Sequence, residues 1–358
     1  MSPDRKRVLV VDDSVFARRI VSDILATNPN LQVVGTAVNG RDGLEKFRAL
    51  KPDVITLDIE MPEMNGFEML RAVMQERPTP VVILSSLTTR GARESFAALG
   101  LGAVDVMAKP HGSHSIGLAQ QAEELISKVL AAANIDISTL QIPQVRTVST
   151  QLKKTAKSCS SFFAVVIIAS STGGPRALRT LIPQLSQDTD AAYIIVQHLP
   201  IGFSGPMAQD LNTITDLEVR EVDNGDEISP GIILIAKSGF HCVVEKGGKI
   251  RLTQTAPMWG VRPAADITMA SAVPVFGSRL VGVILTGMGR DGADGLRMIK
   301  EVGGATIAEH ESTCVIYGMP RSAVELGIVD EIVPITEMGP VINKAALRVL
   351  RQSTNKAA

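Results

Sequence analysis

Three side chains that could together hydrolyse an acyl bond lie between residues 170 and 291 of this 358-residue chain, each shortly after an apolar run. They are a serine of the pair Ser170 and Ser171, then His198 and Asp291. The apolar runs before them cover residues 164–169, 193–196 and 280–285. If these runs are parallel strands of one sheet, the three side chains meet at its carboxyl edge. Serine, histidine and aspartate then supply a nucleophile, a general base and the group that orients the base.

The turn from Ser170 to Pro175 is suited to a nucleophile. It joins the first apolar run to a helix that we expect to begin near Arg176, and the free N–H groups at a helix start favour an oxyanion. The turn does not match the Gly-x-Ser-x-Gly elbow of many hydrolases. Ser170 and Ser171 therefore compete for the role of nucleophile.

A second set of reactive side chains follows apolar runs in the first third of the chain. It comprises Asp12, Asp13, Asp58, Ser85 and Lys109, and the runs cover residues 8–11, 54–57, 81–84 and 104–107. Three converging carboxylates repel one another unless a cation joins them, and Mg²⁺ with its preference for oxygen ligands is the natural partner. Asp58 could then take a phosphoryl group as nucleophile, with Lys109 as a point charge and the Ser85 hydroxyl bonding the phosphate.

Each of these residues, taken alone, has a simpler interpretation. Asp13 or Ser14 suits a helix N-cap, as do the serines before Gly173, and Asp291 suits the N-cap of the helix that follows it. Asp58 could serve as a turn former and His198 as a structural histidine. The combination in one order along the strands favours the chemical interpretation.

The elements that must position these side chains form two α/β domains. A length of 358 residues is about right for two compact cores. In residues 1–133, five β-branched runs, including 31–34, alternate with amphipathic segments at 17–25, 43–50 and 67–74, which predicts a doubly wound parallel sheet. Residues 134–161 are rich in Ser, Thr, Gln and Lys and are predicted to be a linker. A second alternating series, with a further apolar run at 232–236, predicts a doubly wound domain over residues 162–352.

Composition excludes several functional classes. The net charge is −1, with 36 Lys and Arg against 37 Asp and Glu, which does not indicate a nucleic-acid-binding or membrane-surface protein. Three widely spaced cysteines suggest no disulfide framework. No apolar run is long enough for a signal peptide or a membrane span. We therefore expect a cytoplasmic protein that is not embedded in a membrane.

Three motifs in the first domain resemble the receiver domain of bacterial two-component response regulators. They are Val-Leu-Val-Val-Asp-Asp-Ser at 8–14, Asp-Ile-Glu-Met-Pro-Glu-Met-Asn-Gly at 58–66 and Ala-Lys-Pro at 108–110. The resemblance implies a flavodoxin-like fold and phosphorylation of Asp58 by a histidine kinase. It also implies a Mg²⁺ site made by Asp12, Asp13, Asp58 and the backbone carbonyl of Glu60. Receivers often carry an aromatic residue where this chain has Val106, which argues against a switch that depends on rotation of that ring.

Four segments of the second domain, placed after a receiver, resemble the chemotaxis protein-glutamate methylesterase family. They are Ala-Ser-Ser-Thr-Gly-Gly at 169–174, Gln-His-Leu-Pro at 197–200, residues 281–291 and Tyr-Gly-Met-Pro-Arg at 317–321. The match implies Ser171 as nucleophile, His198 as general base and Asp291 as orienting carboxylate, with Met288 and Thr172 in the oxyanion hole. It implies hydrolysis of glutamate methyl esters on methyl-accepting chemoreceptors without a cofactor, commonly with deamidation of receptor glutamines. In the family a chemotaxis histidine kinase donates the phosphoryl group, and the unphosphorylated receiver obstructs the catalytic cleft.

This chain departs from the family pattern at four places. Ala169 and Ser170 stand where the family pattern has Gly and Ala, so only counting back from Gly173 and Gly174 selects Ser171 as nucleophile. Arg290 stands where the family usually has Asn, residues 204–209 lack a basic residue often found there, and further basic and histidine positions are missing around Arg262 and Pro263. We expect these departures to affect the recognition of the substrate. Which receptor or other protein is the substrate, whether deamidation occurs and the oligomeric state stay open.

Two other functions compete with the hydrolase. Residues 287–292 match G-x-G-x-x-G, and Glu309 and Glu311 lie near the spacing of a ribose-binding acid, as in a dehydrogenase. Asp291 would then place a carboxylate against the pyrophosphate, which disfavours that function. The other alternative is a receiver-controlled binding module whose esterase domain is degenerate.

Overall fold

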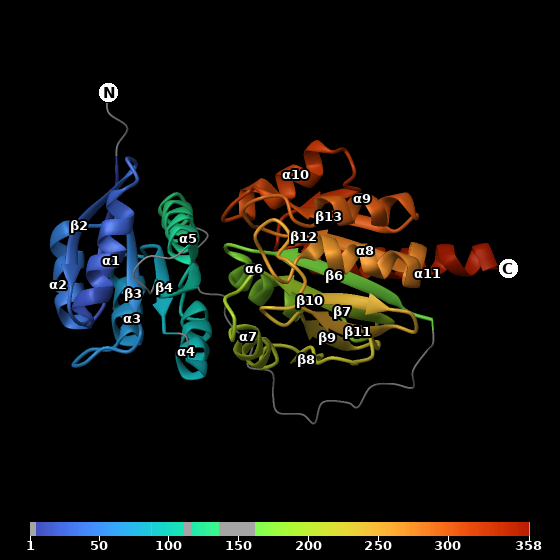
Figure 1. Ribbon diagram of the computed structural model, residues 1–358, viewed down its shortest axis with the longest axis horizontal. Helices are drawn as coiled ribbons and strands as arrows, with labels where there is room; N and C mark the ends of the chain where they lie inside the picture. Colours follow the sequence, from blue (N-terminus) through green and yellow to red (C-terminus); the bar gives the residue numbers. More distant parts are fainter. Residues whose placement is uncertain (1–4, 87, 111–115, 136–161, 358) are drawn as a thin grey trace. The chain divides into compact units, whose positions relative to one another are not determined.

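The computed structural model describes residues 5–86, 88–110, 116–135 and 162–357. The chain divides into two compact units, Met1–Gln144 and Val145–Ala358, which Figure 1 shows in ribbon form. All but the first two residues of the predicted linker, 134–161, lie outside the described residues. The predicted boundaries at 133 and 162 stay predictions.

The first unit is a five-stranded parallel sheet in the order β2-β1-β3-β4-β5. Each strand is followed by a helix, and α1 packs against α5 and α2 against α3. The elements are β1 Lys6–Val11, α1 Val15–Ala26, β2 Leu31–Ala37, α2 Gly40–Leu50, β3 Val54–Asp58, α3 Gly66–Glu76, β4 Val81–Ser85, α4 Thr89–Leu99, β5 Asp105–Ala108 and α5 Ile116–Ala133. Strands β3, β4 and β5 are buried along their whole length, as expected for a parallel sheet covered on both faces. The predicted doubly wound fold is confirmed.

The second unit is a seven-stranded parallel sheet in the order β14-β13-β12-β6-β7-β9-β8. A separate antiparallel hairpin of β10 and β11 packs beside α8. The strands are β6 Ala164–Ser170, β7 Ala191–Gln197, β8 Glu218–Glu221, β9 Ile232–Ile235, β10 His241–Glu245, β11 Lys249–Thr253, β12 Leu280–Ile284, β13 Ala305–Glu309 and β14 Glu331–Val333. The helices are α6 Gly174–Leu181, α7 Ser204–Leu211, α8 Ala265–Phe276, α9 Ala293–Glu301, α10 Met319–Glu325 and α11 Met338–Ala357, with short 3₁₀ turns η2 Ile182–Gln184, η3 Gly277–Arg279 and η4 Glu311–Thr313.

The strand order of each unit places a crevice at the carboxyl edge of its sheet. In each unit the first strand lies inside the sheet, and later crossovers go to both sides of it. Loops diverge at the point where the order reverses, which lies between β1 and β3 in the first unit and between β6 and β12 in the second. Ligand sites of open α/β sheets are found at such points.

The core of the second unit is formed by the apolar strands and the helices that cover them. Leu280, Ile284 and Ile167 are fully buried with Met269 of α8 and Leu296 of α9. Within the described ranges no helix is both long and apolar enough to cross a membrane.

Candidate functional site

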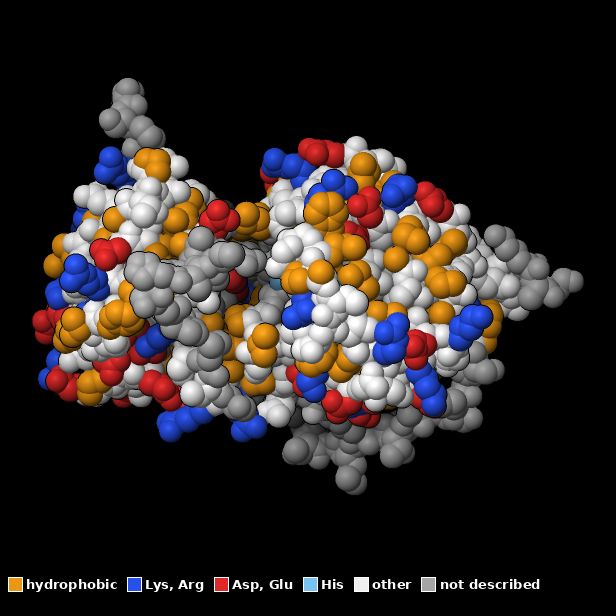
Figure 2. Space-filling view, viewed as in Figure 1, with side chains coloured by type: hydrophobic (Ala, Val, Ile, Leu, Met, Phe, Trp, Pro, Cys, Tyr) orange, Lys and Arg blue, Asp and Glu red, His pale blue; other side chains and the backbone are white. Residues whose placement is uncertain are grey.

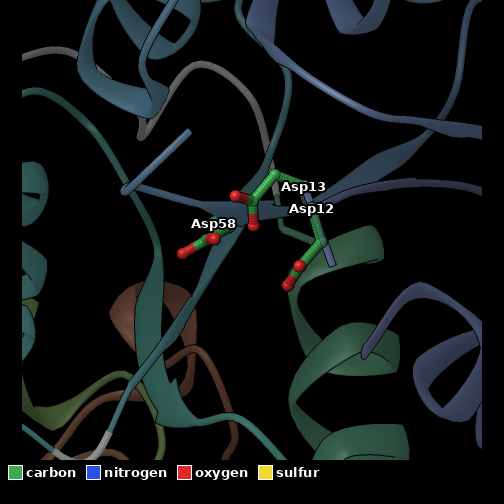
Figure 3. A group of neighbouring side chains, drawn as sticks. All are labelled: Asp12, Asp13 and Asp58. Carbon is green, nitrogen blue, oxygen red and sulfur yellow. The ribbon is translucent and has the colours of Figure 1, made fainter. Parts of the chain in front are cut away.

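Three carboxylates converge at the carboxyl edge of the first sheet, as the sequence predicted. Asp12 and Asp13 follow β1, and Asp58 is the last residue of β3. One carboxylate oxygen from each lies within 4.8 Å of the other two, and Figure 3 shows the three side chains turned toward one another. Asp12 and Asp58 are buried and Asp13 is exposed. The cluster therefore opens to solvent on the Asp13 side.

Lys109 compensates part of this negative charge. Its Nζ lies 2.8 Å from Asp12 Oδ2 and 2.6 Å from Asp58 Oδ2. Burial raises the pKa of Asp58 to about 6, although Lys109 acts to lower it and the neighbouring aspartates add to the rise. For Lys109 burial acts to lower the pKa, but its bonds to Asp12 and Asp58 outweigh burial and the pKa is raised. The lysine is thus held in its charged form against two carboxylates.

The donor set fits a hard divalent cation. Asp12 Oδ2 is buried, and its one close polar neighbour among the described residues is the Lys109 ammonium, 2.8 Å away in an ion pair. An unsatisfied buried oxygen beside two further carboxylates is suited to Mg²⁺. Glu60 donates its backbone N–H weakly to Asp58 Oδ1 at 3.4 Å, and with Asp13 and Arg90 it lines an adjoining cavity of about 410 Å³.

Ser85 lies at the end of β4, one strand along from Asp58. Its hydroxyl is buried and donates to the Ser86 carbonyl at 3.1 Å. It lies close to the start of α4, where a Cβ added at Gly91 would come within 2.9 Å of Ser85 Oγ. The sequence-predicted phosphate contacts, Ser85 and Lys109, therefore occupy the same sheet edge as Asp58.

In the second unit the two candidate serines have different environments. Ser170 is fully buried and its hydroxyl donates to Gln197 Oε1 at 2.6 Å. Gln197 Nε2 donates to the Ser171 carbonyl at 2.9 Å, and the Ser171 N–H donates to the Thr286 carbonyl at 3.0 Å. The Ser171 side chain is partly exposed. Neither serine caps α6, whose N-cap is Gly173 in a left-handed conformation (φ 79°), so the N-cap interpretation was wrong.

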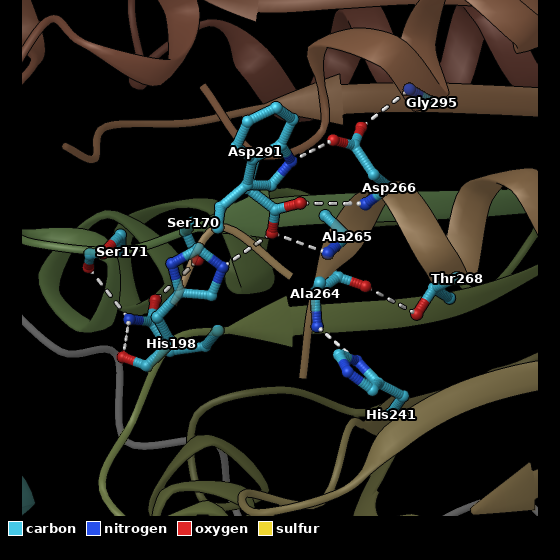
Figure 4. Close-up of polar contacts among 12 residues, drawn as sticks. Ser170, Ser171, His198, His241, Ala264, Ala265, Asp266, Thr268, Asp291 and Gly295 are labelled. Carbon is cyan, nitrogen blue, oxygen red and sulfur yellow. Dashed lines mark hydrogen bonds and ion pairs between the residues drawn. The ribbon is translucent and has the colours of Figure 1, made fainter. Parts of the chain in front are cut away.

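His198 is paired with Asp291 and lies next to the nucleophile turn. Its Nε2 is 2.8 Å from Asp291 Oδ2, and its backbone N–H donates to the Ser170 carbonyl at 3.0 Å. Figure 4 shows the imidazole between Asp291 and the Ser170–Ser171 turn. With Nε2 bonded to Asp291, Nδ1 is the ring nitrogen left for a serine. No hydrogen bond between His198 and the Ser171 hydroxyl is present in the described part of the chain, and such bonds often form only with substrate.

The Asp291 carboxylate is bound by backbone amides at the start of α8, and not by α9, the helix that follows Asp291 in the chain. Its Oδ2 accepts from the Ala265 N–H at 2.7 Å and its Oδ1 from the Asp266 N–H at 3.0 Å, at the start of α8. The next helix, α9, has Gly292 as its N-cap, so the interpretation of Asp291 as its cap was wrong. Burial acts to raise the pKa of Asp291, but His198 and the two amides outweigh it and the pKa is lowered. The carboxylate therefore stays ionised beside the imidazole.

Thr172 and Met288 lie on the two loops that flank the Ser171 hydroxyl. Thr172 is buried and its carbonyl accepts from Thr286 Oγ1 at 3.0 Å. Met288 belongs to the turn after β12, and at its neighbour Gly287 an added Cβ would come within 2.8 Å of Ser171 Cβ. The two loops are thus in direct contact at the nucleophile. That the Met288 and Thr172 amides bind an oxyanion stays a prediction.

Sequence reasoning missed the carboxylate that supports this turn. Glu309 at the end of β13 is fully buried, and its Oε2 accepts from the Thr286 N–H at 2.8 Å while Oε1 accepts from Thr313 Oγ1 at 2.9 Å. Burial raises its pKa to about 7. Thr286 in turn holds the Ser171 N–H. The sequence had marked Glu309 only as a possible ribose ligand, because its contact with Thr286 depends on the pairing of β12 with β13.

The dinucleotide alternative does not fit this geometry. The strand, the Gly-rich turn and the helix are present, but the Gly287 carbonyl accepts from the Gly318 and Met319 N–H groups, at 3.1 and 2.8 Å. A Cβ added at Gly287 would lie 2.4 Å from Met319 Sδ. The turn is therefore packed by protein where a pyrophosphate would lie. Asp291 points to His198, and Glu309 is buried beneath the sheet edge.

Two protein-family models match this chain, one in each of its two units. The family model described as CheB methylesterase matches residues 166–342, and the response regulator receiver domain model matches residues 8–129. A protein-glutamate methylesterase/protein-glutamine glutaminase of Symbiobacterium thermophilum is 46% identical, over 95% of this chain and 96% of the relative. One from Thermotoga maritima is 43% identical, over 92% and 95%.

Among solved structures, the Thermotoga maritima CheB methylesterase catalytic domain is similar to the second unit. It is 38% identical with a TM-score of 0.50, covering 51% of this chain and 98% of that one.

Proposed function

This chain belongs to the CheB methylesterase family, and on that premise we propose that Ser171, His198 and Asp291 are its catalytic residues. The protein is a phosphorylation-regulated hydrolase, a protein-glutamate methylesterase with an N-terminal receiver domain. The observation that carries the residue assignment is the His198–Asp291 pair, 2.8 Å apart, beside the Ser171 turn. We extend the activity to deamidation of glutamine, in line with the names of the relatives.

The hydrolysis proceeds through an acyl-enzyme. Ser171 Oγ attacks the carbonyl carbon of the glutamate methyl ester while His198 Nδ1 takes the hydroxyl proton. The C–O bond to the methoxy group breaks, and His198 returns the proton so that methanol leaves. Water, deprotonated by His198, then attacks the acyl-enzyme and releases glutamate and free Ser171. For a glutamine substrate the same sequence releases ammonia.

Asp291 stabilises the imidazolium that forms in both steps. Its two other hydrogen bonds, from the start of α8, keep its carboxylate oriented toward Nε2 of His198. The developing oxyanion is bound by the backbone N–H groups of Met288 and Thr172, near the positive end of α6. These steps need no cofactor, because side chains provide the nucleophile and the base and backbone N–H groups provide the oxyanion donors.

In the receiver, Asp58 is the nucleophile that takes a phosphoryl group from a chemotaxis histidine kinase. Asp12, Asp13, Asp58 and the Glu60 carbonyl would hold Mg²⁺, which would supply positive charge for the phosphoryl oxygens. Lys109 binds a phosphoryl oxygen, and the Ser85 hydroxyl leaves the Ser86 carbonyl to donate to the phosphate.

We place this reaction in the cytoplasm, with methyl-accepting chemoreceptors as the protein substrate. Incubation with chemoreceptor labelled in its methyl esters, followed by measurement of labelled methanol, tests the assignment. Wild type should release methanol and Ser171→Ala should not. A full-length protein that binds the receptor tightly but releases no methanol, with or without acetyl phosphate and Mg²⁺, would instead identify a binding module with a degenerate esterase domain.

A further inference from the structure

The single tryptophan of the chain lies exposed at the edge of the catalytic crevice. Trp259 is in the loop between β11 and α8, and half of its surface, 51%, is accessible. Its φ is +54°, a left-handed conformation that is uncommon for a bulky side chain. Such a conformation persists only where surrounding contacts hold it, and it is concentrated at functional sites.

Trp259 is fixed by the same helix start that holds the catalytic aspartate. Its indole N–H donates to Asp266 Oδ2 at 2.9 Å. Asp266 is buried, accepts from the Gly295 N–H through Oδ1 at 2.7 Å, and donates its own N–H to Asp291 Oδ1 at 3.0 Å. Figure 4 shows Asp266 between Asp291 and Gly295. The indole is therefore tied to the catalytic residue through one intervening side chain.

Arg290 covers one face of this indole. Its guanidinium carbon lies 4.7 Å from the ring centroid, and 48% of its side chain is exposed. Arg290 directly precedes Asp291 in the chain. Stacking on an aromatic ring orients a guanidinium while leaving its N–H groups free to bind carboxylate.

Arg290 forms an ion pair with Asp294, and this ion pair is weak. Asp294 lies 3.2 Å from Arg290 but also 3.4 Å from Arg297. Exposed pairs of this kind are weak. If Arg290 turns to another carboxylate, Asp294 keeps Arg297 as its partner. The Arg290 guanidinium can therefore leave Asp294 and bind another carboxylate with little loss of free energy.

We propose that Trp259 and Arg290 form a recognition pair that binds an acidic side chain flanking the reacting glutamate ester of the protein substrate. This inference rests on the proposed function and adds a substrate preference to it. The charge of Arg290 selects a carboxylate, and the indole offers apolar surface to the stem of the same residue. Exposed Met288, between the nucleophile turn and Arg290, extends this apolar surface toward Ser171.

The test uses full-length protein activated with acetyl phosphate and Mg²⁺. Its probes are synthetic peptides with one glutamate methyl ester, flanked by glutamate, glutamine or lysine, and the readout is kcat/KM for methanol release. Wild type should prefer the glutamate-flanked peptide over the glutamine-flanked one by about tenfold, the scale of one charge-assisted hydrogen bond. Arg290→Gln should remove the preference, and Arg290→Glu should make the lysine-flanked peptide the best of the three.

Arg297→Gln is the matched control. Arg297 pairs with the same Asp294 and is similarly exposed, but it does not stack on the indole. It should leave the peptide preference as in wild type. Trp259→Leu should weaken the preference with the arginine still present, because the guanidinium loses its support. Turnover of p-nitrophenyl acetate, which has no flanking residues, reports whether each variant keeps its catalytic centre in place.

Two outcomes separate this inference from the proposed function. If wild type hydrolyses all three peptides equally, or if Arg290→Gln keeps the preference for glutamate, the recognition pair is refuted while the esterase stands. If wild type releases methanol from none of the peptides and from no receptor, the proposed function fails and the recognition pair fails with it.

Discussion

Three buried carboxylates in the second unit, those of Asp291, Asp266 and Glu309, differ in the direction of their pKa shifts because their neighbouring groups differ. Asp291 is ionised because an imidazole and two amides face it, and its pKa is lowered. Asp266 and Glu309 receive hydrogen bonds but no cation, and burial raises the pKa of both. Only the first can stabilise a charged histidine. The other two orient the loops around it.

The two serines should respond differently to substitution. Ser171→Ala should reduce hydrolysis to the residual level of a triad without its nucleophile, about 10³ to 10⁴-fold over water. Ser170→Ala should keep most activity but lower the free energy of unfolding by about 1 to 2 kcal/mol, because Gln197 Oε1 loses its buried donor. A fluorophosphonate probe with mass-spectrometric site mapping checks the assignment. Label on Ser170 rather than Ser171 would show that the nucleophile is misassigned.

Glu309 should make the second unit less stable at alkaline pH. Its pKa is raised from 4.5 to about 7, so between these values the folded protein holds a proton that the unfolded chain has lost. The free energy of unfolding therefore falls by about 3 kcal/mol in total as the pH rises from 4.5 through about 7. Glu309→Gln has no charge; its amide oxygen can accept from the Thr286 N–H and its amide nitrogen can donate to Thr313 Oγ1, so the substitution should remove this loss.

Urea unfolding followed by Trp259 fluorescence measures the effect, since the only tryptophan lies in the second unit. Glu309→Gln should exceed wild type in free energy of unfolding by up to about 3 kcal/mol at pH 8 and match it near pH 4. Parallel pH profiles for the two proteins would mean that Glu309 does not titrate in this range.

At the level of elements, the continuously apolar strands of the second unit could be predicted, and the strands that include charged residues could not. The runs at 164–169 and 280–285 correspond to β6 and β12, because buried parallel strands are continuous apolar segments. Strands β8, β10, β11, β13 and β14 were not predicted. Each of them carries at least one charged residue, which interrupts the continuous apolar pattern.

The residues of the candidate site also fall into two groups, those that the sequence predicted and those that it did not. Residues directly after predicted strands were found, because strand ends of a parallel sheet share an edge. Asp266, Trp259 and Thr286 were missed, since their partners lie on elements that pack together only in the folded chain. Helix α8 itself gave no periodic signal, because it is apolar on most sides and has Pro274 inside it.

The start of α8 should couple catalysis to helix stability. Asp291→Asn keeps an oxygen for one α8 amide but loses the charge facing His198, so kcat should fall on the order of 10⁴-fold with little change in folding. Asp291→Ala should lose similar activity and also about 1 kcal/mol of stability, the usual value of a helix cap. Kinetics and thermal unfolding of both variants check this. Equal stability of the two would show that the α8 contacts are not stabilising.

At the scale of the whole molecule, the receiver must act on a catalytic unit that is complete without it. The Ser171, His198 and Asp291 side chains and their supports all lie in the second unit. A predicted linker of 28 residues would span roughly 30 Å as a random coil, enough for one domain to dock over the other's active edge. We therefore propose that the unphosphorylated receiver regulates the second unit by covering its crevice.

Phosphorylation should relieve this inhibition. Phosphorylation replaces the single charge of the Asp58 carboxylate by a phosphoryl group with close to two negative charges, and this change needs to favour the undocked state by only about 3 to 5 kcal/mol to shift the population decisively. We expect deletion of residues 1 to about 150 to raise basal methanol release, acetyl phosphate with Mg²⁺ to raise that of the full chain, and Asp58→Asn to leave an active but unresponsive enzyme. Assays of all three proteins with and without phosphodonor check this. Equal activity throughout, with no gain on truncation, would leave the receiver a role in localisation only.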